Sequence, residues 1–283
     1  GMQGDGGGAG AAMASTAPVS GAVEVRICNL GGPLCTVLAE PAWTVSDLKR
    51  AVEAAKSIPW LAQRLLLGAA ELLDAALVGS LVSTGGALEL TLLRRSEKQV
   101  KWLGRVRDNW TAIVEAPPSI LSDKEVMLAA VQQQGKVLRH ASEELKADRA
   151  VALAAVEQCG VALGWAAAAL RGDREVASVA VQQTGAALEY ASHDLRSDLE
   201  FVLKAVSRSP TVVQFASTAL RADRAFGLHL VARDGRALRY LSEELRADRE
   251  VVLLAAKQNL KALLFASEEL QEDEELQAAL GFA

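Results

Sequence analysis

Apolar and polar positions recur every 25 residues through the C-terminal part of the chain. One column of this repeat holds aspartate, at Asp123, Asp148, Asp173, Asp198, Asp223, Asp248 and Asp273. A second column holds leucine, at Leu145, Leu170, Leu195, Leu220, Leu245 and Leu270. A period of this length is typical of helical units that stack on one another, because one unit alone cannot bury its apolar face.

The pattern inside each unit predicts two helices. An aspartate carboxylate accepts hydrogen bonds from the free N–H groups of a first helical turn, and acidic residues such as Glu125 suit the positive end of the helix. The column at Gly135 is expected to end this first helix, after about eleven residues, in a backbone conformation that costs other residues more. Leu138, Ala141 and Leu145 then keep helical spacing, which predicts a second helix of about ten residues.

Helices this short do not persist alone, so successive pairs must pack against one another. The sequence therefore predicts an α-solenoid over residues 123–283, with six 25-residue repeats and a C-terminal cap that begins at Asp273. Residues 97–122 keep a faint version of the register and are interpreted as a degenerate capping repeat or linker. In that segment Trp102 and Trp110 are expected to cover the exposed end of the stack.

The repeat has further columns, and together they carry a resemblance to a known family. Glycine at the thirteenth place is followed by an aromatic column of His140, Trp165, Tyr190, Phe215, Tyr240 and Phe265. With the aspartate and leucine columns, residues 122–272 resemble the repeats of domain of unknown function 4116. Pro210 and Leu260 depart from the glycine column, so the turn between helices is expected to differ there. The resemblance implies a fold and leaves the function open.

The N-terminal part of the chain changes to a mixed α/β pattern over residues 22–96. Residues 23–27 alternate as a half-buried strand does, a Gly-Gly-Pro turn follows, and residues 34–38 form the returning strand. A helix start at Thr44 precedes apolar residues at helical spacing, and Pro59 ends that segment. Residues 64–67 and 88–92 complete a predicted sheet.

This order of elements resembles ubiquitin. The residues that carry the resemblance are Ser57-Ile58-Pro59, the run Gln63-Arg64-Leu65-Leu66-Leu67-Gly68, the pair Leu72 and Asp74, and the closing stretch from Leu81 to Leu92. It implies an α+β ubiquitin-like (β-grasp) domain that precedes the all-α solenoid of helix-turn-helix repeats.

Proteins similar to ubiquitin bind partners through an apolar patch on the sheet. Carried over by position, the patch centre falls on Leu66, with Arg64 beside it and Leu30 in the hairpin turn. Glu89 stands where the family has the patch histidine and Thr91 where it has the patch valine. The resemblance therefore implies a partner surface that is more polar and more acidic than that of ubiquitin.

On the solenoid, the seventeenth place of the repeat is the candidate specificity column, because packing does not dictate its residues. The column varies freely, and its candidate binding members are Arg139, Glu189, Gln214 and Arg239. Glutamines also recur near the end of the first helix, at Gln132, Gln133, Gln158, Gln182, Gln183 and Gln258. These amides could line one face of a peptide groove, but a solvated helix end is the favoured interpretation.

Composition and charge exclude several classes of partner. The formal net charge is −5 and the pI about 5.4, which argues against nucleic acid because such binding needs a basic face. No run of about 18 uncharged apolar residues predicts a membrane span. Three cysteines without metal-ligand spacing fit a reducing compartment. We expect a eukaryotic, intracellular protein, cytoplasmic and/or nuclear, with a flexible tail over residues 1–21.

No candidate for catalysis emerges from the titratable residues. His140, His193 and His229 occupy different columns and lack ligand spacing, and each cysteine lacks a nearby histidine–acid partner. The aspartates, one per unit at a helix start, are expected to act as helix caps and to bind no metal. We therefore expect no catalytic, cofactor-binding or metal site.

The expected function is that of a non-catalytic adaptor. In this hypothesis the solenoid binds a protein or peptide and the ubiquitin-like domain docks a second partner, in ubiquitin or proteasome signalling. The alternative is a structural or assembly subunit in which both domains only pack inside a larger complex. The sequence leaves the oligomeric state open.

Overall fold

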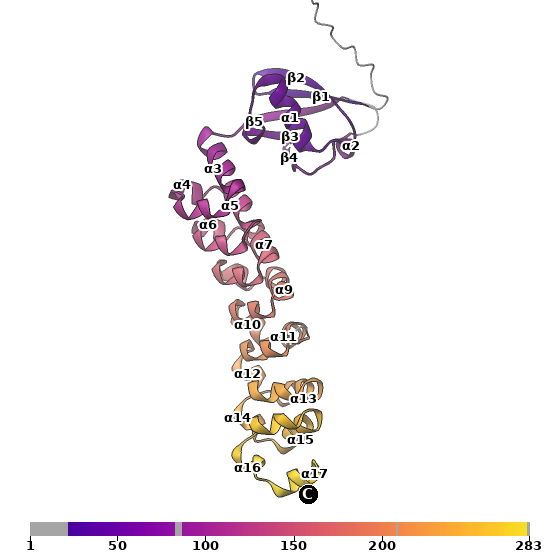
Figure 1. The fold of residues 1–283 in the computed structure, drawn as a ribbon, viewed down its shortest axis with the longest axis vertical. Helices are drawn as coiled ribbons and strands as arrows, with labels where there is room; N and C mark the ends of the chain where they lie inside the picture. The colour runs from indigo at the N-terminus through magenta and orange to yellow at the C-terminus, as the bar shows by residue number, and fades with distance from the viewer. Residues whose placement is uncertain (1–21, 83–86, 208, 282–283) are drawn as a thin grey trace, which may run out of the picture. The chain divides into compact units, whose positions relative to one another are not determined.

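The computed structural model describes residues 22–82, 87–207 and 209–281 (Figure 1). The expected N-terminal tail lies outside these residues. The chain divides into two compact units, one up to Lys101 and the other from Trp102 onward. Each unit has its own hydrophobic core.

The first unit is a five-stranded mixed sheet with one helix packed on it. Its strands lie in the order β2-β1-β5-β3-β4, and the central pair β1 and β5 is parallel. Their bounds are Val23–Asn29 for β1, Gly32–Ala39 for β2, Gln63–Leu67 for β3, Ala70–Glu71 for β4 and Leu88–Arg94 for β5. This topology is that of the β-grasp fold and confirms the predicted class. The short strand β4 and the one-turn helix α2 (Val78–Leu81) were not anticipated.

Helix α1 (Val45–Lys56) begins and ends with local signals that the sequence contains. The Thr44 hydroxyl accepts from the Asp47 N–H, and the Asp47 carboxylate accepts from the Thr44 N–H, which makes a capping box. Ser57 ends the helix in the left-handed region, with φ of 55°. Leu48 and Val52 face the sheet and are fully buried against its core residues.

A buried amide ties this helix to the sheet. The side chain of Gln63, which opens β3, is fully buried, and its Nε2 donates to the carbonyls of Lys49 and Ile58, each at 2.8 Å. Gln63 opens the run of residues that resembles ubiquitin, and these two bonds give it a structural role there. The 3₁₀ turn η1 (Trp60–Ala62) brings the chain from Ile58 to this strand.

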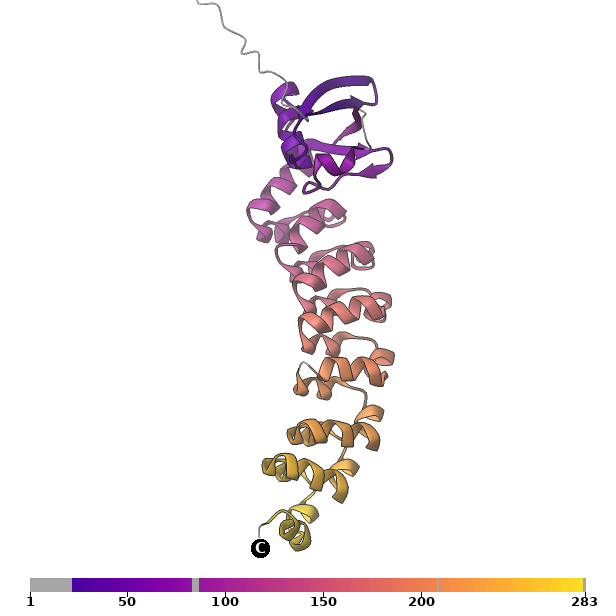
Figure 2. The same ribbon diagram turned by 90° about the vertical axis from the view of Figure 1, so that its right-hand side faces the viewer.

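Every repeat of the second unit has three helical segments (Figure 2). The long helices are α5 (Lys124–Val131), α7 (Arg149–Gln158), α9 (Arg174–Gln183), α11 (Leu199–Val206), α13 (Arg224–Arg233) and α15 (Arg249–Gln258). Each is followed by a 3₁₀ helix: η3 (Gly135–His140), η4 (Gly160–Trp165), η5 (Gly185–Tyr190), η6 (Pro210–Phe215), η7 (Gly235–Tyr240) and η8 (Leu260–Phe265). A short helix closes the repeat: α6 (Glu143–Lys146), α8 (Ala168–Arg171), α10 (His193–Ser197), α12 (Thr218–Arg221), α14 (Glu243–Arg246) and α16 (Glu268–Gln271).

The same three segments precede the first of these repeats. They are α3 (Glu97–Asp108), η2 (Trp110–Glu115) and α4 (Pro118–Leu121), the last with proline at its first helical position. The Trp102 side chain is buried and belongs to the core of the second unit. At the other end the chain forms α17 (Glu274–Ala279), which Asp273 caps.

The prediction of one continuous second helix was wrong. The backbone is extended at Ala141, with φ −63° and ψ 155°, and again at Ser142, so the segment splits into η3 and α6. The Ser142 hydroxyl accepts from the Leu145 N–H and caps the new helix. In the same repeat the Ser142 N–H donates to the Leu121 carbonyl of the preceding segment, which links neighbouring units through backbone atoms.

The aspartate column caps the long helices, as predicted. The Asp148 carboxylate accepts from the N–H groups of Ala150 and Val151, and equivalent bonds start the long helix of each repeat from Asp123 to Asp273. The explanation offered for the glycine column was wrong, because the column glycines do not adopt positive φ. A Cβ on Gly135 would instead lie less than 3.0 Å from the Ala155 carbonyl oxygen of the next repeat. Glycine is therefore required by close approach of two repeats.

Candidate partner-binding surfaces

The first candidate surface is the face of the sheet that α1 leaves uncovered. Side chains alternate along a strand, so burial of Leu65, Leu90 and Leu92 against α1 turns their neighbours outward. Leu66 of β3 lies opposite Thr91 of β5 in the antiparallel ladder. The structure thus brings four of the residues proposed from sequence onto one face, namely Arg64, Leu66, Glu89 and Thr91.

Ion pairing changes the charge that this face presents. Arg64 Nη2 lies 2.5 Å from Glu71 Oε2, and this bond holds the pKa of Glu71 below its ordinary value. The cation beside Leu66 is therefore neutralised, and Glu71, which the sequence did not single out, belongs to the surface. Cys28 donates to Glu89 Oε1 at 3.7 Å, and burial together with that carboxylate raises the pKa of the Cys28 thiol.

Leu30 stands apart from the paired strands. It lies in the turn between β1 and β2 and is 91% exposed, the largest exposed fraction among the large apolar residues reported for the described chain. The Gly31 N–H donates to the Asn29 side chain, and Gly32 takes a φ of 120° that favours glycine. The hairpin therefore presents an apolar side chain at the edge of the sheet.

The second candidate surface is a row of 3₁₀ helices along the solenoid. The seventeenth-place residues are the fifth residues of η3 to η8, and neighbouring 3₁₀ helices contact one another. Arg139, Glu189, Gln214 and Arg239 are all exposed there, as the sequence predicted. Leu264 occupies the same place in the last full repeat and is 71% exposed.

A half-buried aromatic column supports these exposed residues. The Arg239 guanidinium lies over the rings of Tyr240, at 4.7 Å, and Phe265, at 5.6 Å, so the cation is fixed by the next repeat. At Gly164 a Cβ would lie 2.8 Å from the Tyr190 ring, which explains the small residue at this place. The surface formed by the seventeenth-place residues and the aromatic column is called the 3₁₀ face below.

Charge on the 3₁₀ face is mixed. His140 Nε2 accepts from Arg139 Nε at 2.8 Å, and burial, with the nearby cations Arg139 and Lys146, lowers the pKa of His140. The shift favours the neutral form of His140. Among the seventeenth-place residues of this face, Arg139 and Arg239 are basic and Glu189 is acidic.

Sequence analysis missed an ion-pair ladder that joins the repeats. The residue after each aspartate is basic in most repeats, and its side chain pairs with the aspartate of the following repeat. The pairs are Lys124–Asp148 at 2.6 Å, Arg149–Asp173 at 3.2 Å, Arg174–Asp198 at 2.6 Å, Arg224–Asp248 at 2.8 Å and Arg249–Asp273 at 3.6 Å. The signal was present, because these basic residues share the 25-residue spacing of the aspartates.

The glutamine column also joins repeats, which differs from the solvated ends that were expected. Gln133 Nε2 donates to the Val106 carbonyl at 2.8 Å, and Gln183 Nε2 donates to the Glu157 carbonyl at 2.5 Å. Gln158 accepts from the Gly135 N–H at 2.9 Å. These amides satisfy backbone groups at the ends of the preceding long helices, so they are not free to line a groove.

Within the described ranges, no cluster of histidine, cysteine, aspartate and glutamate could hold a metal ion. In the same ranges, none of the helices is both long enough and apolar enough to cross a membrane.

Comparison with protein families identifies the repeats. Residues 106–146, 123–171, 173–221 and 228–271 match the family described as Domain of unknown function (DUF4116), and together these matches span more than half of the chain. The chain belongs to this family. The DUF4116 matches begin inside α3, so they include part of the segment that precedes the first full repeat.

Other comparisons add little to the DUF4116 assignment. A search of curated proteins found no match. Among solved structures, that of ATBAG1 in complex with HSP70 is similar at 13% identity, over 69% of this chain and 93% of that chain, with a TM-score of 0.30. A similarity this loose carries no argument about fold or function.

Proposed function

We propose that this protein is a non-catalytic adaptor that binds a protein or peptide on the 3₁₀ face of its solenoid. The observation that carries the proposal is the arrangement of that face. Exposed and variable side chains stand in a row, and one of them, Arg239, is held over the rings of Tyr240 and of Phe265 in the next repeat. Restricted side chains lose less conformational entropy on binding, which favours recognition.

The β-grasp unit supplies the second surface of the proposed adaptor. Leu66 lies on the uncovered sheet face opposite Thr91, and Leu30 lies in the exposed turn. We propose that this unit docks a component of ubiquitin or proteasome signalling. Glu89 and the Arg64–Glu71 pair make the surface more polar than that of ubiquitin, so a partner with basic or polar groups is favoured.

Co-purification tests the adaptor proposal. The tagged wild type is compared with Leu66→Asp and with a triple variant that combines Arg139→Glu, Glu189→Lys and Arg239→Glu. The matched control is Lys257→Glu with Glu268→Lys, which alters exposed charges away from the 3₁₀ column. We expect mass spectrometry to show that each surface variant loses a different partner while the control loses none. If both variants keep every partner of the wild type, the adaptor proposal is wrong.

A further inference from the structure

The junction between the fourth repeat (residues 198–222) and the fifth (223–247) lacks the features that close the other junctions. Leu199 stands where the ion-pair ladder needs a basic residue, and Ala225 replaces the second acidic partner. Pro210 stands in the column where glycine allows close approach. Arg233 takes the place of the glutamines Gln133, Gln183 and Gln258, whose side chains donate to the preceding long helix.

These substitutions coincide with a separation of the long helices. α7 packs closely against α9, and α13 against α15, whereas α11 makes few contacts with α9 and fewer with α13. A Cβ on Gly185 would meet the Val212 side chain, at 2.7 Å, rather than a backbone carbonyl of α11. The short-helix side stays joined, because the Ser242 N–H donates to the Arg221 carbonyl at 3.0 Å.

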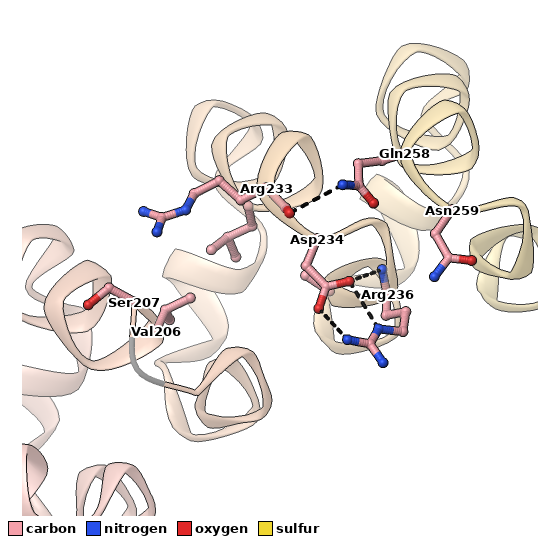
Figure 3. A pocket seen from close by; sticks show the side chains of 9 residues that line it. Val206, Ser207, Arg233, Asp234, Arg236, Gln258 and Asn259 are labelled. Carbon is pink, nitrogen blue, oxygen red and sulfur yellow. Dashed lines mark hydrogen bonds and ion pairs between the residues drawn. The ribbon is translucent and has the colours of Figure 1, made fainter.

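The separation leaves a groove of about 380 Å³ between α11 and α13 (Figure 3). Val206 and Leu230 are its apolar lining residues. Gln258 and Asn259 also line it. Asp234 accepts two bonds from the Arg236 guanidinium, each at 3.1 Å, so this carboxylate is already neutralised.

Arg233 differs from the other charged residues of the groove. Its side chain is exposed, and its guanidinium forms no hydrogen bond or ion pair with any described residue (Figure 3). A second groove of about 370 Å³ lies between α9 and α11, but its cation, Lys204, pairs with Glu200 at 2.8 Å. Only the first of these two grooves therefore offers an unpaired cation.

We propose that the groove between α11 and α13 binds an acidic peptide segment, with a carboxylate of the peptide on Arg233 and a small aliphatic side chain beside it on Val206. The inference rests on the proposed function and names a partner chemistry for a different surface of the same solenoid. Charge complementarity selects the occupant, because Asp234 is neutralised by Arg236 and the remaining charge is positive. Gln258 Nε2 donates to the Arg233 carbonyl at 3.5 Å and Asn259 Oδ1 accepts from the Lys261 N–H at 3.0 Å, so these amides are held in the wall of the groove.

Selection from a library of short random peptides with capped ends tests this proposal on the full chain. We expect the selected peptides to carry an acidic residue next to a small aliphatic one. Arg233→Glu is expected to weaken their binding by at least about tenfold. The matched control, Lys257→Glu, makes the same change of charge on α15 outside the groove, and it is expected to bind as the wild type does.

A second variant separates loss of the groove from loss of folding. Leu199→Arg, Pro210→Gly and Ala225→Glu together restore the features of the other junctions, so the groove is expected to close and the peptides to be lost although Arg233 is intact. Thermal unfolding must show this variant at least as stable as the wild type. Peptides that bind Arg233→Glu as tightly as the wild type overturn the inference. If they instead depend on Arg239, the adaptor function stands and the groove assignment fails.

Discussion

Glycine recurs at the start of the 3₁₀ segments because two backbones meet there. In the junctions that begin at Gly135, Gly160 and Gly235, a carbonyl of the next long helix approaches the glycine so closely that no Cβ fits. The helical propensity of glycine is poor, so its repeated presence marks a packing requirement. The same reasoning gives significance to Pro210, which with Leu260 departs from the glycine column.

Gly160→Ala is therefore expected to lower the free energy of unfolding of the solenoid by about 1–3 kcal/mol, because a Cβ there must displace the Ala180 carbonyl. Gly172→Ala is the matched control, since a Cβ at that site meets its nearest atom at an ordinary 3.5 Å. Urea unfolding measures both. Equal destabilisation by the two changes would refute the close-approach explanation.

The ion-pair ladder predicts a pH dependence of stability. Arg224 donates to Asp248 and holds the pKa of that carboxyl below its ordinary value. A carboxyl whose pKa is lower in the folded state than in the unfolded state stabilises the fold. This stabilisation is complete at a pH above the unfolded-state pKa, near 4, and is lost as the pH falls through the folded-state pKa. Asp248→Asn is therefore expected to be less stable than the wild type at neutral pH, and this difference should vanish on acidification.

Urea unfolding at neutral and acidic pH checks this expectation. Asn at position 248 keeps the helix cap, so the variant isolates the charge. Asp223→Asn is the control, because Leu199 stands where the basic partner would be. The ladder would not stabilise the solenoid if the two variants behaved alike at both pH values.

At the scale of elements, three segments per repeat explain how short helices remain folded. Serine hydroxyls cap the short helices α6, α10, α12 and α14, as Ser217 does by accepting from the Leu220 N–H at 3.2 Å. Backbone bonds between repeats, such as the Ser217 N–H to the Arg196 carbonyl, then hold each short helix to its neighbour. Local caps and contacts between repeats thus replace the stability that helix length would supply.

The separated helix α11 is expected to open more readily than its neighbours. It lacks close packing on the side of α13, so the backbone amides of residues 199–206 should exchange hydrogen faster than those of α7, which packs closely against α9. Mass-spectrometric hydrogen exchange on the full chain measures both helices at once. Equal protection of α11 and α7 would contradict the interpretation that α11 packs loosely against α13.

At the scale of the whole molecule, the chain contains two cores that share no buried residue in the described ranges. Leu90 is fully buried in the β-grasp core and Leu188 is fully buried in the solenoid core. The two units are therefore expected to unfold in separate transitions, which is common where cores are independent.

Calorimetry of two single variants tests this separation. Leu90→Ala is expected to destabilise the β-grasp transition by about 2–5 kcal/mol and to leave the solenoid transition unchanged. Leu188→Ala serves as its reciprocal control and should act on the solenoid alone. If each substitution shifts both transitions, the two units are coupled.

Much of the architecture could be read from the sequence, because it depends on local signals. The 25-residue period, the aspartate caps and the alternation of the strands depend on residues a few places apart, and they predicted the solenoid and the β-grasp unit. The exposed places of Arg139, Glu189, Gln214 and Arg239 followed from the same register.

Only the tertiary structure decided how the repeats meet. The split of the second helix, the reason for the glycines, the glutamine bonds and the ion-pair ladder all involve partners about 20 to 27 residues apart, on different repeats. The groove beside Arg233 likewise depends on the absence of such contacts between α11 and α13. Sequence by itself determined the long helices and the principal strands. The packing of neighbouring backbones decided how the repeats are spaced, because local hydrogen bonding does not specify distances between repeats.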